Sequence, residues 1–215
     1  MTRALIASFG FDEKFVVRAI LRHGIGAGDE IILVTGRPEE KAQKAYETVK
    51  QLADSADAKV SLKQLNEAIY DFKQLIRETK KILLDAIERH AKVTLLLSGG
   101  MRVIVLGLYT ALLLLPKQLR EKVKVELDTE DTYRLVEIPD SILNLFEVPE
   151  LGAKKDLLAV IVNEPGLTIE GLARRLNKDE STIRRQLQAL LSLGLVRVEG
   201  RPQRAYPTPA AEALL

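Results

Sequence analysis

The chain has 215 residues, 47% apolar side chains and no cysteine, which suits one large or two small globular domains and excludes disulfides and thiolate metal sites. Its net charge is only +2, but residues 153–215 carry 10 basic and 7 acidic side chains, so the basic excess lies in the C-terminal part. Any contact with nucleic acid is therefore expected there. The sequence has many charged residues and neither cysteine nor tryptophan, a composition that favours a thermophilic source.

The sequence shows no targeting or membrane-spanning pattern. The N-terminal residues MTRALIASFGF lack the architecture of a signal peptide. The longest apolar run, Val103–Leu115, is too short for a bilayer span and contains Tyr109 and Thr110. We therefore expect a soluble, cytoplasmic protein with no membrane partner. With only two histidines, a histidine-rich metal site is not expected either.

Strands and helices are predicted to alternate along the first part of the chain. Short apolar or alternating runs predict strands, and longer runs with an apolar residue every three or four positions predict helices. The predicted strands are 3–9, 30–34, 59–65 and 92–97, and the predicted helices are 13–22, 38–53, 71–91 and 103–115.

Two further strands, 123–127 and 133–138, are predicted around an acidic turn at 128–131. Alternating strands and helices indicate a mainly parallel sheet with helices on both faces, which is a Rossmann-like α/β fold. Ligands bind to such sheets beyond the carboxyl ends of the strands, where the strand order reverses.

Two predicted strands end in short loops that contain glycine. The first loop is Ser8-Phe9-Gly10-Phe11, and the second is Ser98-Gly99-Gly100-Met101-Arg102. A strand, a glycine turn and a helix N-terminus form an anion site, since free N–H groups point outward there. Arg102 lies in the first turn of its predicted helix, where the helix dipole disfavours a positive charge. A bound anion beside Arg102 would explain a cation at this position. Alternatively, the glycines only make a tight turn and Ser8 only caps a helix.

The catalytic patterns of ordinary hydrolases are missing from this sequence. It contains no paired carboxylates, Ser-His-Asp set or metal-ligand spacing at a recognisable position. We therefore expect binding at the two glycine loops rather than hydrolysis by these familiar groups.

The C-terminal part is predicted to be a small winged helix-turn-helix domain. Residues 139–152 contain Pro139, Pro149 and Gly152 and resemble a linker or a short connecting helix. Helices are predicted at 155–163, 169–176 and 180–193, followed by a hairpin of strands 195–199 and 204–208. Three helices followed by a basic hairpin are typical of a winged helix, in which the third helix reads DNA.

The outward face of the third helix is the candidate DNA-binding surface. Its apolar residues recur at helical spacing and point inward, which leaves polar residues outside. The expected contacts are Ser181, Thr182, Arg184, Arg185 and Gln188 with the major groove, and Arg201 and Arg204 of the wing with the backbone or minor groove. Two alternatives remain open: a solvated helix face, and a winged helix used only for dimerisation or protein binding.

The segment TIEGLARRLNKDESTIRRQLQALLSLGLVRV resembles the winged-helix regulators of the bacterial and archaeal repressor type. Together with the loops S-F-G-F and S-G-G-M-R, the whole chain resembles the archaeal CRISPR-associated transcriptional regulators that carry a CARF domain. The resemblance implies a CARF ligand-sensing and dimerisation domain at 1–138, a linker at 139–152 and a DNA-binding domain at 153–215.

In that family the Rossmann-like domains dimerise, and a cyclic oligoadenylate, typically the four-adenosine ring, lies across the two-fold axis. The resemblance implies no other cofactor and places this ligand against Ser8, Phe9, Gly10, Phe11, Ser98, Gly99, Gly100, Met101 and Arg102. A homodimer is also favoured by the apolar helix 103–115 and by the pairing of winged helices on two-fold DNA sites. The expected function is a ligand-responsive regulator that binds double-stranded DNA.

Two other functions remain open. Some CARF proteins cleave the ring that they bind, and Ser8 and Arg102 could help to position a ribose 2′-hydroxyl and stabilise charge without a metal. The sequence assigns no catalytic residue, so a regulator is preferred to an enzyme. A metabolite-sensing winged-helix repressor unrelated to CRISPR would share every feature derived from the residues themselves.

Overall fold

The computed structural model describes residues 2–37, 40–145, 148 and 151–215. These residues form two compact units, Met1–Ile138 and Pro139–Leu215. The predicted Rossmann-like α/β class with a smaller winged-helix unit is confirmed.

The first unit contains a six-stranded sheet with the order β3-β2-β1-β4-β5-β6. Neighbouring strands are parallel except for β5 and β6, which are antiparallel. The strands are β1 Arg3–Ser8, β2 Glu30–Thr35, β3 Lys59–Gln64, β4 Lys92–Leu96, β5 Val123–Asp128 and β6 Leu135–Ile138. The order reverses between β1 and β4, so the loops that follow these two strands flank the switch point.

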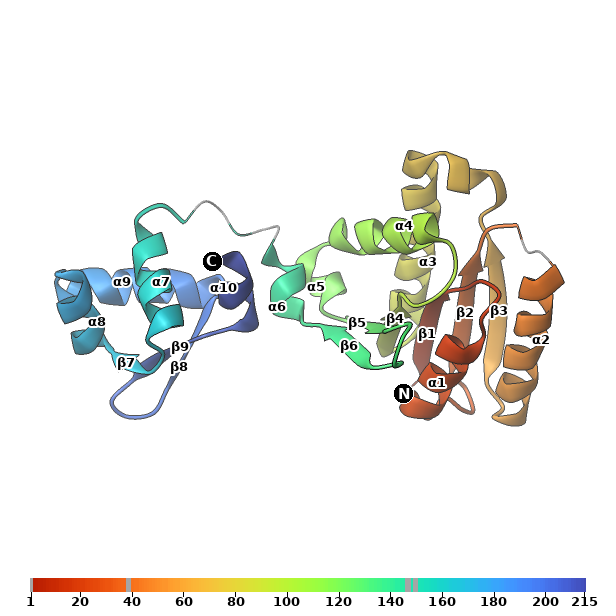
Figure 1. Cartoon of the computed structure of the whole chain (residues 1–215), viewed down its shortest axis with the longest axis horizontal. Helices are drawn as coiled ribbons and strands as arrows, with labels where there is room; N and C mark the ends of the chain where they lie inside the picture. Colours follow the sequence, from red (N-terminus) through yellow and green to blue (C-terminus); the bar gives the residue numbers. More distant parts are fainter. Residues whose placement is uncertain (1, 38–39, 146–147, 149–150) are drawn as a thin grey trace. The chain divides into compact units, whose positions relative to one another are not determined.

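Helices cover the sheet on both faces (Figure 1). The helices α1 Lys14–His23 and α2 Glu40–Ser55 share a core with alternate residues of β1 and β2. The helices α3 Phe72–Arg89 and α4 Arg102–Leu113 pack against each other and bury the opposite row of strand residues. The start of the predicted helix at Pro38 lies outside the described residues.

The helices α3 and α4 approach each other closely at Gly107. A Cβ on Gly107 would lie 2.7 Å from Cγ of Leu75, so a larger residue has no room there. The hydroxyl of Thr79 donates to the carbonyl of Gly107 at 3.2 Å. The C-terminus of α4 is capped by the buried Arg120, whose Nη1 donates to the carbonyls of Leu113 and Leu115 at 2.9 and 3.1 Å.

Two short elements of this unit were not predicted from the sequence. The 3-10 helix η1 Asn66–Tyr70 precedes α3, and the short helix α5 Lys117–Arg120 precedes β5. Each is about one turn long, and a single turn leaves too short an apolar pattern for periodicity to detect.

The second unit has a core of three helices and a small antiparallel sheet, ordered β7-β9-β8. Its main elements are α7 Lys155–Asn163, α8 Ile169–Leu176, α9 Glu180–Ser192, β8 Val196–Glu199 and β9 Arg204–Pro207. These agree with the predicted helices and hairpin to within one residue at most boundaries. The short strand β7 Leu167–Thr168 and the final helix α10 Pro209–Leu214 were not predicted.

Part of the predicted linker packs with the second unit. A short helix, α6 Asp140–Leu143, follows Pro139, and Leu143 is fully buried. Among the described residues further on, Leu145 and Val148 pack against the core of the second unit. The described residues of the segment 139–152 therefore contribute apolar side chains to this core.

Side chains cap the N-termini of α8 and α9, and a left-handed residue ends α8. The hydroxyl of Thr168 accepts the N–H of Gly171 at 3.2 Å, and Oδ1 of Asp179 accepts the N–H of Thr182 at 2.8 Å. Asn177 ends α8 in the left-handed region, with φ of 51°. These caps fix the turn between α8 and α9, and hence the start of the predicted reading helix.

No helix in the described part of the chain combines the length and apolar character that a membrane span requires.

Candidate functional site

The loops after β1 and β4 touch each other at the switch point of the sheet. A Cβ on Gly100 would lie 2.8 Å from the backbone nitrogen of Phe9, and a Cβ on Gly10 would lie 3.0 Å from Cα of Gly100. Backbone therefore packs directly on backbone, which only glycine allows. We call the two loops, Ser8–Phe11 and Ser98–Arg102, the loop rim.

The second loop of the rim has the backbone geometry of an anion site. Gly99 and Gly100 have φ of 81° and 72°, in the left-handed region that favours glycine. The described part of the chain offers no hydrogen-bond acceptor to the N–H groups of Gly99, Gly100 and Met101. These groups precede the first turn of α4, where the helix dipole favours negative charge.

Three of the predicted ligand contacts turn their side chains into the protein. Ser8 and Phe9 are 1% and 2% exposed, and Ser98 is 5% exposed. The hydroxyl of Ser8 donates to the carbonyl of Gly99 at 3.0 Å, and the N–H of Phe9 donates to the carbonyl of Val34 at 2.8 Å. These residues brace the rim, so the side chains of Ser8 and Ser98 are not directed at a ligand in this chain alone.

The remaining predicted contacts are exposed, except for Gly10 and Gly99, which are half-buried. Phe11 is 74% exposed and Met101 is 45% exposed, and Gly100 and Arg102 are exposed as well. No ion pair or hydrogen bond engages the Arg102 side chain within the described residues. The rim thus offers backbone N–H groups, one free cation and two apolar side chains.

A third loop adjoins the rim and was missed in the sequence. A Cβ on Gly36, directly after β2, would lie 2.9 Å from Sδ of Met101 and 3.4 Å from Cδ1 of Ile69 in η1. The next residue, Arg37, is exposed. The Thr-Gly-Arg-Pro turn after a buried strand was the available signal, because the carboxyl ends of parallel strands share one edge of the sheet.

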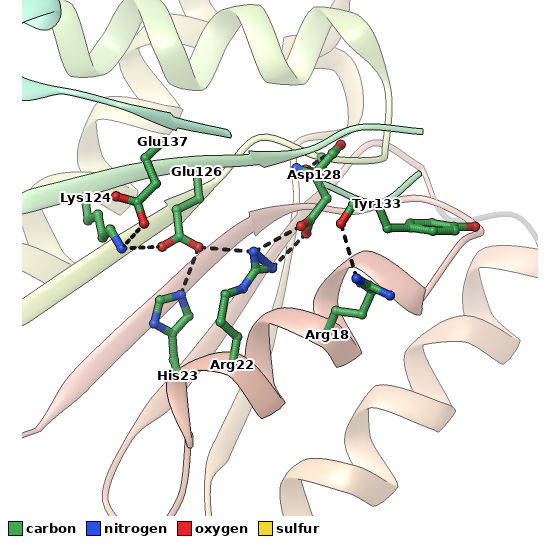
Figure 2. Close-up of polar contacts among 9 residues, drawn as sticks. Arg18, Arg22, His23, Lys124, Glu126, Asp128, Tyr133 and Glu137 are labelled. Carbon is green, nitrogen blue, oxygen red and sulfur yellow. Dashed lines mark hydrogen bonds and ion pairs between the residues drawn. The ribbon is translucent and has the colours of Figure 1, made fainter. Parts of the chain in front are cut away.

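An ion-pair network around two buried carboxylates, Glu126 and Asp128, holds α1 against β5 (Figure 2). Arg22 makes a bidentate pair with the carboxylate of Asp128 at 3.0 and 2.8 Å. The N–H of Asp128 donates to Oγ of Ser98 at 2.5 Å. The second loop of the rim is therefore tied to α1, which is the helix that follows the first loop.

Glu126 lies at the centre of the same network (Figure 2). Its carboxylate pairs with Nε2 of His23 at 2.9 Å and with Nζ of Lys124 at 2.9 Å, and Lys124 continues to Glu137 of β6 at 2.6 Å. Burial raises the pKa of Glu126, but the hydrogen bonds and charges of Lys124 and His23 outweigh burial and hold this pKa below its usual range. Glu126 is therefore ionised at neutral pH.

Tyr133 packs beside the network, at the turn between β5 and β6. Its ring lies 5.7 Å from the ring of Phe15, and the guanidinium of Arg18 lies 5.0 Å above its centroid. Nη2 of Arg18 also donates to the carbonyl of Tyr133 at 3.2 Å (Figure 2). These contacts add apolar and cation–π packing to the ion pairs between α1 and the β5–β6 hairpin.

The predicted polar face of α9 is exposed except for the half-buried Thr182, but several of its side chains have partners. Ser181 and Thr182 donate their hydroxyls to Asp179 at 2.5 and 2.9 Å. Those hydrogen bonds, with the N–H of Thr182, hold the pKa of Asp179 well below its usual range. Arg184 pairs with Glu180 at 2.9 Å, whereas Arg185 and Gln188 are exposed with no partner in the described chain.

The arginines of the predicted wing also differ from one another. Nη1 of Arg204 donates to the carbonyl of Gly166 at 2.8 Å, which ties the wing to the start of β7. Arg197 stacks over the ring of Tyr206 at 5.0 Å and pairs with Glu199. Arg201 is exposed in the turn and has no partner among the described residues.

The described residues contain no group of three or more histidine, cysteine, aspartate or glutamate side chains that could hold a metal ion. The rim residues form no described hydrogen-bonded acid–base set either. The chemistry that the rim offers is recognition of an anion by backbone N–H groups and Arg102.

Comparison with known families agrees with this fold. The model of the Csa3 CRISPR-associated Rossmann-like domain matches residues 3–139, which is more than half of the chain. The chain belongs to this family. The Csa3-type domain spans the six-stranded sheet and all three loops at its carboxyl edge. A second family model, HVO_A0114, matches residues 152–210 in the winged-helix unit.

Solved structures similar to the Csa3-type chain share little sequence with it. Protein VC1899 from Vibrio cholerae has a TM-score of 0.50 at 10% identity, over 99% of this chain and 63% of its own. Can2 from Sulfobacillus thermosulfidooxidans, solved in complex with cyclic tetra-adenylate, has a TM-score of 0.43 at 12% identity, over 98% of this chain and 62% of its own.

The repressor MarR from Listeria monocytogenes has a TM-score of 0.28 at 25% identity, over 34% of this chain and 53% of its own. The Csa3-type chain therefore spans less than two thirds of the length of each of these three proteins. The likeness to VC1899 is one of fold. No curated protein matches the chain significantly.

Proposed function

We propose that this chain is a ligand-responsive, DNA-binding regulator of a CRISPR system. In this proposal the Csa3-type domain binds a cyclic oligoadenylate at the loop rim of a homodimer, and the winged-helix unit binds double-stranded DNA. The observation that carries the proposal is the backbone contact between Gly100 and Phe9 at the switch point, in a CRISPR-associated Rossmann-like family. This contact brings two glycine loops and their unpaired N–H groups to one edge.

A ring of nucleosides joined by phosphodiesters fits the chemistry of the rim. Backbone N–H groups and Arg102 suit phosphate oxygens, while Phe11 and Met101 offer exposed apolar surface on which bases can stack. The rim lacks a free carboxylate to bind ribose hydroxyls as in dinucleotide enzymes. Cyclic tetra-adenylate is the proposed ligand because its two-fold symmetry matches a homodimer.

The homodimer is supported by the surface of α4. Leu106 on this strongly apolar helix and Leu114, its C-cap residue, are each 56% exposed. Exposed leucines on and beside an apolar helix suit burial against a second copy of the chain. A dimer would also bring two loop rims together.

The geometry favours sensing over cleavage of the ring. The hydroxyls of Ser8 and Ser98 are buried and engaged by backbone groups, so neither is free to orient a ribose 2′-hydroxyl. Arg102 alone would supply charge stabilisation without a general base. Membership of a CRISPR-associated family also favours this proposal over a metabolite sensor unrelated to CRISPR.

Calorimetric titration with cyclic tetra-adenylate tests the ligand site. We expect one ring per two chains, and we expect Arg102→Gln to weaken binding. Lys92→Gln is the matched control, since Lys92 is an exposed cation at the start of β4 and therefore at the opposite edge of the sheet. Equal affinities for Arg102→Gln and the parent would move the site away from the rim, and one ligand per chain would favour the metabolite sensor.

A further inference from the structure

The reading surface of the winged-helix unit carries carboxylates that oppose DNA. Asp179 caps α9, and Glu180 and Glu170 line the same surface hollow as Arg184 and the wing-turn residues Pro202 and Gln203. In a helix-turn-helix the N-terminal residues of the reading helix approach the bases and the neighbouring phosphates. Each carboxylate there repels a phosphate.

The arginines on this surface are not equally available. Arg184 pairs with Glu180 at 2.9 Å, Arg197 pairs with Glu199, and Arg204 donates to the carbonyl of Gly166. By contrast, no partner engages Arg185 or Arg201 in the described part of the chain. The number of arginines on this surface is therefore larger than the number that are free to bind phosphate in the described structure.

From these contacts we infer that Glu180 limits the affinity of this unit for DNA of arbitrary sequence. It pairs with Arg184 and adds negative charge to the hollow between α9 and the wing turn. Selectivity is a difference between affinities, so weaker non-specific binding raises the preference for a cognate site. The inference rests on the proposed DNA binding and adds a residue that the predicted contact set did not contain.

Glu180 suits this role because it does not hold the helix together. The N-cap of α9 is Asp179, whose carboxylate accepts the N–H of Thr182, and this cap stays in place when Glu180 is changed. The exposed Glu180–Arg184 pair is of a kind that contributes little stability. A change at Glu180 should therefore alter DNA binding without unfolding the unit.

The test measures binding of the full chain to a labelled duplex of arbitrary sequence across a range of NaCl concentrations. Each phosphate neutralised by a cation contributes a slope of about −0.9 to log K against log salt. If Glu180→Gln releases Arg184 to one phosphate, the ratio of affinities at ~50 and ~200 mM NaCl should rise about 3.5-fold relative to the parent.

Two further variants separate this explanation from a general change of charge. Glu40→Gln removes a carboxylate from an equally spaced pair, with Lys44 on α2 of the first unit, and should leave the salt slope unchanged. Adding Arg184→Ala to Glu180→Gln should return the slope to the parent value. In the parent background Arg184→Ala should leave the salt slope almost unchanged, because that arginine is already paired with Glu180.

The outcomes distinguish this inference from the proposed function. An unchanged slope in Glu180→Gln, with normal binding by the parent, overturns the role of Glu180 and leaves DNA binding intact. An equal rise in Glu40→Gln overturns it too, because net charge would then be sufficient. If the parent binds no duplex even at low salt, DNA binding and this inference are both overturned.

Discussion

The two units of this chain use charged side chains in different ways. Among the described residues, every buried polar or charged side chain lies in the first unit, including Arg120, Glu126 and Asp128. The described charged side chains of the second unit are exposed or half-buried, and several form pairs within one element, such as Glu180 with Arg184. Ion pairs therefore stabilise the first unit around its loop rim. The exposed ion pairs of the second unit can instead open when a charged partner binds.

The largest expected effect comes from breaking the buried network. Arg22→Ala should destabilise the first unit by about 3 kcal/mol, because it leaves the buried carboxylate of Asp128 without its bidentate partner. Arg184→Ala on the surface should cost less than about 0.5 kcal/mol. Urea unfolding, followed by hydrogen exchange in each unit, measures the loss of unfolding free energy in both variants. Equal losses would contradict the proposed difference between the two units.

The next effect tests the backbone contact at the rim. Gly100→Ala combines a left-handed φ of 72° with a Cβ 2.8 Å from the Phe9 nitrogen, so it should cost about 2 kcal/mol or more. Gly24→Ala is the matched control, since φ there is 55° but nothing lies within 4 Å of the added Cβ. It should cost only about 1 kcal/mol.

The same contact changes how a larger residue at Gly100 would act. Gly100→Val would block the approach of a ligand only if the rim kept its shape. The structure shows that it would push against the Phe9 backbone and distort the rim itself. Equal stabilities of Gly100→Ala and Gly24→Ala in chemical denaturation would show that the two loops do not meet as described.

On the proposed DNA-binding face, the two arginines that have no partner among the described residues should affect DNA binding in different ways. Arg185→Ala should cost about 1–2 kcal/mol on a duplex selected from a random pool, and less on arbitrary sequence, if this residue reads a base. Arg201→Ala should weaken both duplexes similarly and make the salt slope shallower by about 1. Fluorescence anisotropy measures both, and an Arg185→Ala variant that bound the selected duplex like the parent would remove Arg185 from base readout.

The smallest expected effect is the contribution of Glu126 to acid stability. Its pKa is lowered in the folded state, so its stabilising contribution is present above the unfolded pKa of about 4.3 and is lost as the pH falls through the folded pKa. Glu126→Gln should therefore make the first unit less sensitive to pH below about 4.5, by less than about 1.4 kcal/mol per pH unit. Hydrogen exchange in β5 as the pH is lowered measures this, and an unchanged slope would contradict it.

Features set by the backbone and by apolar periodicity were predictable from the sequence. The alternation of strands and helices gave the correct elements, and the glycines at Gly99 and Gly100 marked a turn with positive φ. Likewise, Thr168 and Asp179, which cap α8 and α9, are residue types that are preferred at helix N-caps. In each case the interactions that determine the structure join residues that are close together in the sequence.

Features set by tertiary contacts were not predictable in this way. Ser8 and Ser98 look like ligand contacts in the sequence, but their hydroxyls bond to Gly99 and Asp128, and the latter is 30 residues away from Ser98. The approach of Gly36 to Met101 depends on strand order, which periodicity does not reveal. The pair of Glu180 and Arg184 could have been expected from its i,i+4 spacing.

The proposal that one chain couples ring binding to DNA binding is tested most directly by titrating one duplex with and without saturating cyclic tetra-adenylate. We expect the duplex affinity to change at least ~5-fold, the lower end of allosteric coupling, and the ring affinity to change by the same factor when DNA is present. Arg102→Gln should reduce the ring's effect at sub-saturating concentrations. Superimposable DNA isotherms with and without bound ring would contradict a ligand-responsive regulator.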